Sequence, residues 1–529
     1  MTARARTAAL SAAAAALGAC FLLLCLNASR RTSASFDESF NILSGWEFSR
    51  SGRLPDGQPN PPLLLRLLAL PLPAEGLAPP DVEACLAAPR SCGYRFVYSN
   101  SVPPDVLLGR ARAVCMAQGL LLVLLCGLWA YGLGGAAAAL PALALAAFMP
   151  PLLALSSAAG ADIGNALLCT AALYLFWRAS VSGKVLPAAA AGLFCGLAPA
   201  GKYTAVLLLP LGAFYVLYDG GVGRGRKFIW WSLAAAAALA AACLPVTPWK
   251  WLSGGLAVAR ELEAGHVTYL LGNVSREGSW YYFPLALLIK TPLPALVLGA
   301  AGLRVLPSRR EDMLYLLLPA AAWLALGLAA KTQVGIRHLL PVYPLLCVWA
   351  GFAAGELWRS GGALRRALTA GLLLWQAAAA VAASPWQLSY FNELAGGTAG
   401  GYRYLLDSNL DWGQGLRELS AYARAKGADH IYLSYFGCGD PHAYGLKYSP
   451  VLMTSCAPLP GDGPPPPEGR QLLAVSATNR MGVYYTPRTL FSWLDGMVPE
   501  RIAGGSIWVY DVTGNARALK LLSYPGLSQ

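Results

Sequence analysis

The chain contains a series of long apolar segments, and their number and length limit the folds that it can adopt. A run of about 17–25 apolar residues is long enough to cross a bilayer as a helix, and a helix satisfies all of its backbone polar groups internally. About eleven such runs are predicted, at residues 8–26, 113–133, 136–155, 162–177, 185–200, 203–218, 228–246, 284–303, 314–330, 339–354 and 368–383. The sequence therefore predicts a mostly α-helical, polytopic membrane protein with about 11 transmembrane helices.

The composition agrees with a membrane protein. Charged residues make up 13% of the 529 residues, about half of the roughly 25% that is usual in soluble domains. The net charge of +13 does not indicate nucleic acid as a partner, because Lys and Arg of a polytopic protein collect in its short cytoplasmic loops. Most of the cysteines lie in apolar segments, where a free thiol behaves as a small hydrophobic side chain.

The short loops predict the orientation of the chain. With the N-terminus in the cytoplasm, the cytoplasmic loops hold the positive clusters at residues 178–184, 224–227, 304–310 and 359–366, while the short loop at residues 156–161 on the other side carries no positive charge. The first apolar segment is then a retained helix instead of a cleaved signal peptide. We expect a bacterial-type inner membrane, with outer pieces at residues 27–112, 247–283 and 384–529.

Acidic and aromatic residues mark the first outer loop, residues 27–112. Residues 35–40 read SFDESF directly after the first apolar segment, and charges beside lipid are costly enough to indicate a function. Phe36, Phe40, Leu43 and Trp46 recur at helical spacing, which predicts an interfacial amphipathic helix. A rigid turn follows, and then an apolar helix at residues 63–70 that is too short to span the membrane.

The C-terminal part of the chain has a different pattern. Predicted strands at residues 431–436, 472–476 and 507–511 alternate with helical stretches, which indicates a small α/β domain on the outer face. The sequence thus divides into a transmembrane domain, residues 1–385, and an outer domain, residues 386–529. Cysteines on the outer side, in an oxidising compartment, offer two candidate disulfides, Cys85–Cys92 and Cys438–Cys456, whose connectivity the spacing leaves open.

Several motifs recur in a fixed order on the outer side. After the Asp37–Glu38 pair come Asn-Pro-Pro-Leu and the motifs at residues 157–162, 201–204, 289–294 and 335–341. Together they resemble the GT-C-type glycosyltransferases, with family 39, the protein O-mannosyltransferases, and the aminoarabinose transferases of lipid A as the nearest relatives. The resemblance covers about the first 385 residues, and residues 404–414 (YLLDSNLDWGQ) are similar to bacterial members.

The resemblance implies inverting transfer of a sugar from a polyprenyl-phosphate donor to a protein, lipid or glycan acceptor on the extracytoplasmic face. An acceptor hydroxyl needs a base and a departing phosphate needs cations. Asp37 is the predicted general base, and Glu38 would orient the acceptor or tune that base. Asp162 would hold sugar hydroxyls or the acceptor. The residues predicted to bind the carrier phosphate are Arg112, Lys202, Lys290, Arg337 and His338.

Structural roles explain some of the same residues. Glu38 completes the pattern of a capping box, and Asp37 and Asp162 both gain from the dipole of the helix that each begins. Lys202 has a side chain long enough to reach the membrane surface from an apolar segment. Arg337 is placed where a basic residue anchors a helix among lipid headgroups.

Other functional classes stay open as well. A polytopic transporter or a flippase of lipid-linked sugars would share the many helices, although the sequence lacks the internal symmetry typical of transporters. A non-catalytic scaffold would explain the outer domain but not the SFDESF charges. No cofactor is indicated, and a divalent metal is left open.

Overall fold

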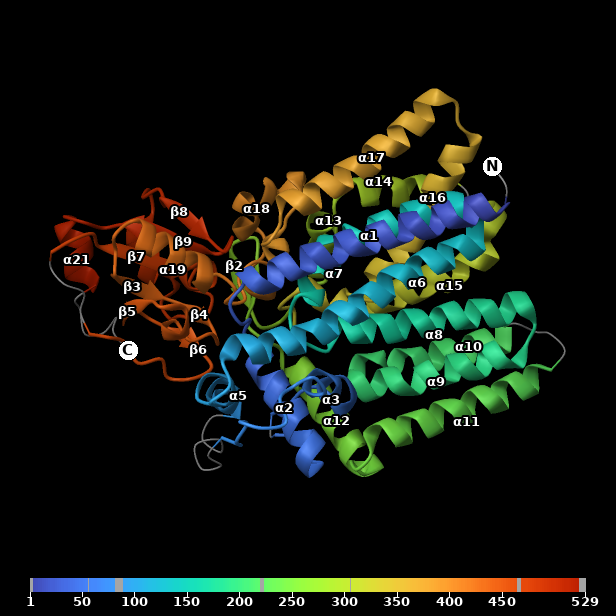
Figure 1. The fold of residues 1–529 in the computed structure, drawn as a ribbon, viewed down its shortest axis with the longest axis horizontal. Coiled ribbons are helices and arrows are strands. Elements are labelled where there is room, and N and C mark those ends of the chain that lie inside the picture. The colour runs from blue at the N-terminus through green and yellow to red at the C-terminus, as the bar shows by residue number, and fades with distance from the viewer. Residues whose placement is uncertain are drawn as a thin grey trace.

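The computed structural model describes residues 3–55, 57–80, 89–218, 223–304, 306–463 and 468–522. Long helices run side by side, and a small domain that contains the main sheet lies beyond one end of them (Figure 1). Each predicted apolar segment is helical over most of its length. The helices concerned are α1 (Ala3–Arg31), α6 (Pro104–Ala147), α8 (Asp162–Ser182), α9 (Val185–Gly201), α10 (Leu208–Tyr218), α11 (Arg224–Cys243), α13 (Tyr282–Lys290), α14 (Leu293–Gly302), α15 (Leu306–Ala329), α16 (Val342–Ser360) and α17 (Ala363–Ala382).

Helix α6 contains the break that separates two of the predicted segments. Gly134 and Gly135 leave the helical conformation, and Gly135 has a φ of 63°, which favours glycine. A β-carbon on Gly127 would lie within 2.4 Å of Leu143, which is possible only if the chain reverses direction at this break. The expected division into residues 113–133 and 136–155 is therefore confirmed, and α7 (Pro150–Ser156) ends the second part.

Among the described residues, three helices are long and apolar enough to cross a membrane, one each in residues 7–31, 104–147 and 310–329. The number rises to five if two bent pairs each form one span. These pairs are α11 with α12 (Pro248–Ala264), bent by 87°, and α13 with α14, bent by 109°. Each break contains a proline, Pro245 in the first and Pro292 in the second, which removes a backbone donor and ends the preceding helix. The number of eleven crossings stays a prediction.

The first outer loop folds into short helices packed together. Helix α2 (Glu38–Ser51) corresponds to the predicted amphipathic helix, and α3 (Pro62–Ala69) to the short apolar one. Most of α2 is buried between α3 and α5 (Pro89–Tyr98), so it does not lie on the surface as an interfacial helix would. A β-carbon on Gly45 would lie 1.9 Å from the carbonyl oxygen of Leu65, so glycine permits this close crossing.

The small domain is built on a mixed five-stranded sheet with the strand order β5-β3-β7-β9-β8. The strands are β3 (His430–Ser434), β5 (Lys447–Pro450), β7 (Leu472–Ser476), β8 (Arg501–Ala503) and β9 (Ile507–Asp511). The first three are parallel, whereas β9 is antiparallel to both β7 and β8. The α/β domain expected from the sequence is present, and two of its strands match the predicted bounds.

Alternation along the strands gives this sheet an apolar layer on each side. Ile431 and Leu472 face one layer with α19 (Leu416–Ala425), and Leu473 and Val475 face another with α21 (Ala516–Leu522). Successive side chains of a strand point to opposite faces, so a strand buried on both sides is apolar throughout. This explains why residues 472–476 read as a continuous apolar run.

The segment between the helices and the small domain packs against both. Phe391, Leu405 and Leu410 belong to the apolar core of the helices, so the domain boundary at residue 385 stays a prediction.

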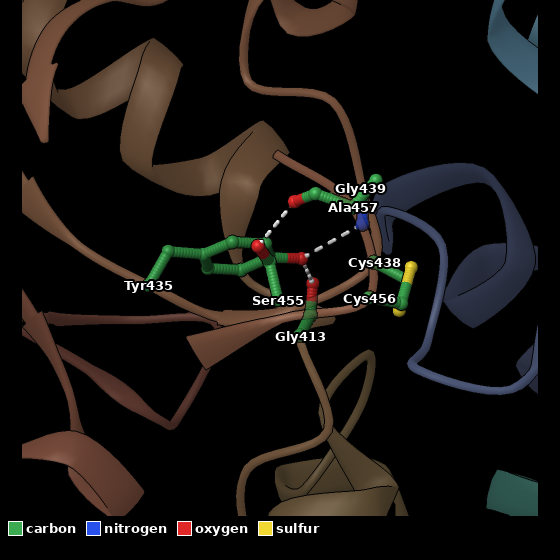
Figure 2. The surroundings of a disulfide bond; sticks show 7 residues. All are labelled: Gly413, Tyr435, Cys438, Gly439, Ser455, Cys456 and Ala457. Atoms are coloured by element: carbon green, nitrogen blue, oxygen red, sulfur yellow. Dashed lines mark hydrogen bonds between the residues drawn. A yellow bond between two sulfur atoms is a disulfide. The ribbon is translucent and has the colours of Figure 1, made fainter. Parts of the chain in front are cut away.

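The predicted Cys438–Cys456 disulfide is present, and Cys85 lies outside the described residues. Beside the disulfide, the hydroxyl of Tyr435 accepts from the amide of Gly439 and donates to the carbonyl of Gly413 (Figure 2).

Candidate functional site

A cavity of ≈ 390 Å³ lies between the ends of the helices and the small domain. It is lined by residues from the first outer loop, the start of α8, the 3₁₀ helix η1 (Tyr203–Leu207), α12, the 3₁₀ helix η2 (Ile336–Leu339) and the small domain. The lining includes Phe36, Asp37, Asp162, Lys202, His266, Arg337, His338, Asp407, Trp412, Phe436 and Tyr484.

An apolar groove of ≈ 280 Å³ adjoins this cavity. The two share Thr204, Leu262, Thr332 and His338 as lining residues. The rest of the groove is mostly apolar, with Phe283, Trp323, Leu326, Ala329, Ala330 and Leu339 among its walls. The charged cavity is thus continuous with a surface that suits a hydrocarbon chain.

Asp37 and Arg337 form an ion pair in the cavity. Their Oδ2 and Nη1 atoms are 2.8 Å apart, and the two side chains stay 25% and 20% exposed. Asp37 precedes the first residue of α2, yet its carboxylate makes no capping hydrogen bond to that helix. The Arg337 guanidinium also stacks on Trp412, with Cζ 4.6 Å from the ring centroid. The structure therefore directs the Asp37 carboxylate to the cavity and not to the helix start.

Asp162 and Lys202 form a second ion pair that faces the same cavity. Asp162 is the first residue of α8, and Lys202 stands at the break between α9 and η1 (Tyr203–Leu207), where its backbone is extended. His338, in η2 (Ile336–Leu339), lies beside both cations. Burial, followed by the charges of Lys202 and Arg337, lowers the pKa of His338 to about 3, so this imidazole is neutral at pH 7.

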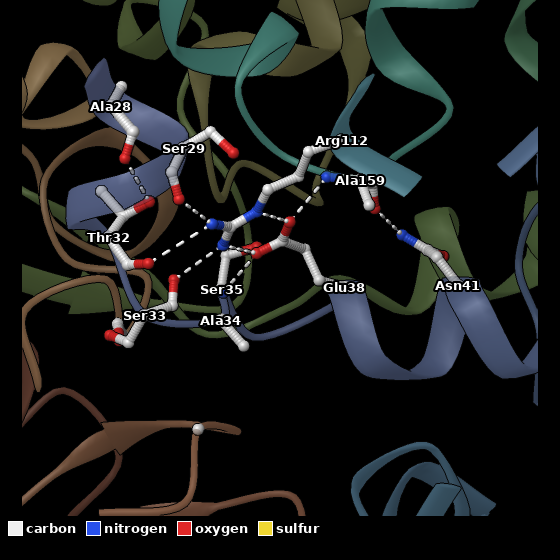
Figure 3. A network of polar contacts seen from close by, with 12 residues as sticks. Ala28, Ser29, Thr32, Ser33, Ala34, Ser35, Glu38, Asn41, Arg112 and Ala159 are labelled. Carbon is white, nitrogen blue, oxygen red and sulfur yellow. Dashed lines mark hydrogen bonds and ion pairs between the residues drawn. The ribbon is translucent and has the colours of Figure 1, made fainter. Parts of the chain in front are cut away.

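Glu38 lies outside the cavity lining, although it follows Asp37 directly in the chain. Its two carboxylate oxygens accept from Nε and Nη2 of Arg112, each at 2.7 Å, and the two side chains are 2% and 3% exposed (Figure 3). The amides of Ala159 and Ser35 also donate to this carboxylate, both at 2.7 Å. Burial alone would raise the pKa of Glu38, but Arg112 and the two amides hold it below its ordinary value.

Arg112 uses its other hydrogens on the turn that leads to Asp37. Its Nη1 donates to the carbonyl of Ser29 at 2.7 Å, and its Nη2 donates to the carbonyl of Ser33 at 2.9 Å. The Ser35 amide supplies the Glu38 half of the expected capping box, whereas the Ser35 hydroxyl has no hydrogen-bond partner in the described part of the chain. The structure does not bring Arg112 to the cavity.

Lys290 is also absent from the cavity lining. Its Nζ donates to the backbone carbonyls of Leu388, Tyr390 and Asn409 at 2.8, 2.5 and 2.5 Å. It further lies 4.3 Å from the ring centroid of Phe391. A buried ammonium whose three donors are all used holds backbone segments together and is not available to a ligand.

Residues 404–414, whose role the sequence left open, connect both sides of the site. The Asn409 side chain accepts from the amide of Ile336 at 2.9 Å, next to Arg337. The carbonyl of Trp412 accepts from the amide of Phe36 at 2.9 Å, next to Asp37. The chain at Gly335 also comes so close that a β-carbon there would lie 2.1 Å from the Ser408 hydroxyl. This segment thus fixes the two members of the Asp37–Arg337 pair.

Sequence reasoning missed several residues that the small domain brings to the cavity. Phe436 and Tyr484 come from positions far from every motif, and His266 precedes the short strand β1 (Thr268–Leu270). The motif at residues 404–414 was a signal for Asp407 and Trp412. Nothing in the sequence marked Phe436 or Tyr484, because a single aromatic residue near a strand is ordinary core composition.

A metal site was tested on the same geometry. Within the described ranges, no group of three or more His, Cys, Asp or Glu side chains is placed to hold a metal ion.

Comparison with solved structures shows the fold. The chain matches ArnT from Cupriavidus metallidurans in the apo state with a TM-score of 0.50 at 13% identity, over 98% of this chain and 100% of that one. It matches ArnT bound to undecaprenyl phosphate with a TM-score of 0.50 at 14% identity, over 99% and 100%. An Archaeoglobus fulgidus oligosaccharyltransferase in complex with zinc and sulfate matches over 68% of this chain and 53% of that one, with a TM-score of 0.44 at 12% identity.

The chain thus shares the fold of the GT-C membrane enzymes, as the sequence motifs indicated. No protein-family model and no curated protein matches the sequence.

Proposed function

We propose that the chain is a membrane glycosyltransferase that moves a sugar from a polyprenyl-phosphate carrier to an acceptor hydroxyl with inversion. The observation that carries this proposal is the cavity, in which the Asp37–Arg337 and Asp162–Lys202 pairs face one space that opens to an apolar groove. An acid, two cations and an adjoining hydrocarbon surface suit a lipid-linked sugar phosphate. The structure of ArnT with undecaprenyl phosphate supports the same ligand class.

Arg337 and Lys202 are the proposed phosphate-binding residues. Arg337 offers a planar fork that matches phosphate oxygens, and Lys202 adds a point charge from another segment. The neutral His338 imidazole lies between the cavity and the groove, and its Nε2 is buried without a partner in the described residues. It is placed to hydrogen-bond the phosphate at the point where the carrier's hydrocarbon chain enters the groove.

Asp37 is the proposed general base. The acceptor oxygen attacks the anomeric carbon, its proton passes to the Asp37 carboxylate, and the bond between the anomeric carbon and the phosphate oxygen breaks with its electron pair left on the phosphate. Charge gathers on that phosphate as the bond breaks, so Arg337 and Lys202 stabilise the transition state more than the ground state. Asp162 is proposed to bind hydroxyls of the sugar or the acceptor.

The pairing of Asp37 with Arg337 makes base activation depend on donor binding. In the free protein Arg337 and Lys202 are each held by a carboxylate, so the base is engaged. An incoming phosphate competes for Arg337, because two phosphate oxygens can accept from the guanidinium in a bidentate pair, as a carboxylate can. The carboxylate of Asp37 is then released for the acceptor proton, which couples base activation to donor binding.

Glu38, Arg112 and Lys290 are proposed as positioning residues. The Glu38–Arg112 pair holds the turn that presents Asp37, and Lys290 joins the backbone at Tyr390 to the backbone at Asn409. We retain the orientation proposed from the loops, with the N-terminus cytoplasmic and the cavity extracytoplasmic. The disulfide in the small domain supports an oxidising location for the cavity, which lies at the same end of the helices.

Reconstitution tests the proposal. The lipid that co-purifies with the full-length protein is identified by mass spectrometry, and transfer of its sugar to candidate acceptors is then measured in proteoliposomes. Transfer that requires Asp37 supports the proposal, with Asp429→Asn as a control, because Asp429 is an exposed acid far along the chain in the small domain. Movement of the glycolipid across the bilayer without sugar transfer would instead indicate a flippase.

A further inference from the structure

The small domain supplies one wall of the cavity, and the mechanism above uses none of its side chains. This wall contains Asp407, from the segment that joins the domain to the helices, and Tyr484 and Phe436 from the domain itself. Phe36, beside Asp37, continues the wall across the first outer loop. A carboxylate next to aromatic rings on one side of a cavity has a chemistry of its own.

Asp407 is held in one orientation. Its backbone has a φ of 54°, a left-handed conformation that costs a non-glycine residue of the order of 1 kcal/mol. Its Oδ1 accepts from the amide of Ser408, and its Oδ2 accepts from the hydroxyl of Tyr484, both at 2.6 Å. Each carboxylate oxygen has a second lone pair, so the acid can accept further hydrogen bonds from a ligand in the cavity.

The aromatic rings form an apolar stack beside this acid, and its outer rings, Phe36 and Tyr484, border the cavity. Tyr484 and Phe436 are nearly parallel, at 6° with centroids 5.7 Å apart, and Phe436 and Phe36 are stacked at 5.2 Å. Phe436 is buried between the other two rings, which are both partly exposed. An aromatic face carries negative potential and attracts the weakly positive hydrogens of a C–H-rich surface.

This combination discriminates among the parts of a lipid-linked sugar. A phosphate would be repelled by Asp407. A hydrocarbon chain would offer no donor to the lone pairs that the Ser408 amide and the Tyr484 hydroxyl leave free on this acid. A sugar ring presents C–H groups on its faces and hydroxyls around its rim, so it can pack on the rings while it donates to Asp407. Charge-assisted hydrogen bonds of this kind are the stronger ones.

We propose that Asp407, Tyr484 and the stacked Phe36 and Phe436 form a subsite that binds a sugar ring through its hydroxyls and C–H face. The inference rests on the proposed function, and it makes the small domain a part of the substrate-binding site. The ring belongs either to the donor or to a glycan acceptor, since the wall borders the same cavity as Asp37 and Asp162.

Binding measurements on the full-length protein in nanodiscs test this subsite. The probes are the co-purifying glycolipid and the same lipid after mild acid has removed its sugar. For a donor subsite, Asp407→Asn and Tyr484→Phe should each weaken glycolipid binding about tenfold, the loss of about 1.4 kcal/mol of hydrogen bonding. Binding of the sugar-free lipid should change less than about twofold, because that probe does not reach the wall.

Kinetics distinguish the other source of the ring. If the subsite holds a glycan acceptor, the same two variants leave glycolipid binding unchanged and raise the KM for the acceptor about tenfold. Phe436→Leu should have the effect of the Asp407 variant. Phe491→Leu, which removes the same ring from a buried position of the small domain, should not, so this control separates the wall from domain stability.

Two results would overturn the subsite. One is equal weakening of both lipid probes in Tyr484→Phe, which would make the wall a support of the phosphate site. The other is unchanged glycolipid binding together with an unchanged acceptor KM in Asp407→Asn, while transfer still depends on Asp37. That result would agree with the proposed transferase activity and would contradict the sugar subsite. A loss of the Asp37 dependence itself would count against the proposed function.

Discussion

Asp37 and Glu38 are neighbours in the chain, but they lie in opposite environments. Asp37 borders the cavity, has one cation partner and is 25% exposed, whereas Glu38 is 2% exposed and has every oxygen engaged by Arg112 and backbone amides. A carboxylate that must take a proton needs access to the substrate, and one that must hold a turn needs complete hydrogen bonding. In the proposed mechanism, the same side-chain chemistry thus serves catalysis at Asp37 and architecture at Glu38.

The Asp37→Asn variant gives the largest expected effect on turnover. It removes the basic oxygen but keeps the size of the side chain and an acceptor for Arg337, so transfer should fall by about 10²–10⁴-fold, the usual contribution of a general base. Melting temperature and binding of the glycolipid should stay near those of the wild type. Transfer at more than a tenth of the wild-type rate would remove Asp37 from the base role.

Changes to the Glu38–Arg112 pair should act on stability instead. Glu38→Gln or Arg112→Met leaves the other charge buried and unpaired, which typically costs about 3–5 kcal/mol. The melting temperature of the detergent-solubilised protein measures this loss. Combining the two changes should restore part of the stability, because no lone charge is then buried. Stable single variants that lose only turnover would place Glu38 among the reacting groups.

The same comparison shows what the sequence could predict. The apolar runs identified the helices, because burial in lipid or protein leaves a signal in composition alone. Asp37, Asp162, Lys202, Arg337 and His338 were predicted for one site, and the structure brings all five to one cavity.

Other parts of the site depended on tertiary packing. Glu38, Arg112 and Lys290 were predicted for the site too, yet each is buried away from the cavity. Whether a charged residue meets substrate or another charge depends on partners far along the chain, such as Arg112, which follows Glu38 by 74 positions. Tyr484 reaches the cavity through the packing of the small domain, which no local pattern records.

Neutralising the cavity cations should have a smaller effect than removing the base. Arg337→Met or Lys202→Met should lower the transfer rate by about 2–4 kcal/mol of barrier, as for loss of an oxyanion-type contact, and should affect glycolipid affinity less. Arg337→Met also frees Asp37 from its ion pair, so a faster reaction would show that the pairing restrains the base more than the cation aids the phosphate. Arg337→Lys should recover only part of the rate, because a point charge lacks the guanidinium fork.

Asp411 extends the comparison with Glu38, because it is a buried acid for which the described residues provide no cation partner. It accepts from the amide of Thr478 at 3.1 Å, and its Oδ1 has no partner within the part of the chain that the structure describes. Burial raises the pKa of Asp411 to about 7, although the hydrogen bond from the Thr478 amide opposes the rise. The acid therefore resembles Glu38 in burial but differs from it in the direction of its pKa.

The two acids should consequently give opposite dependences of stability on pH. The folded state holds the Asp411 proton more tightly than the unfolded chain, whose Asp pKa is about 3.9, so stability should decrease as pH rises from about 4 to about 7. The lowered pKa of Glu38 has the reverse effect, in which stability is lost only as pH falls below about 4.3. Melting temperatures between pH 4 and pH 8 measure both, and Asp411→Asn should remove the decrease between pH 4 and pH 7 while it leaves the acid limb intact. Between pH 4 and pH 7, the free energy of unfolding is expected to decrease by about 1–4 kcal/mol, since one pKa unit corresponds to about 1.4 kcal/mol. If the Asp411→Asn protein kept the full decrease, another group would be responsible for it. The missing cation partner would then not explain why Asp411 and Glu38 differ.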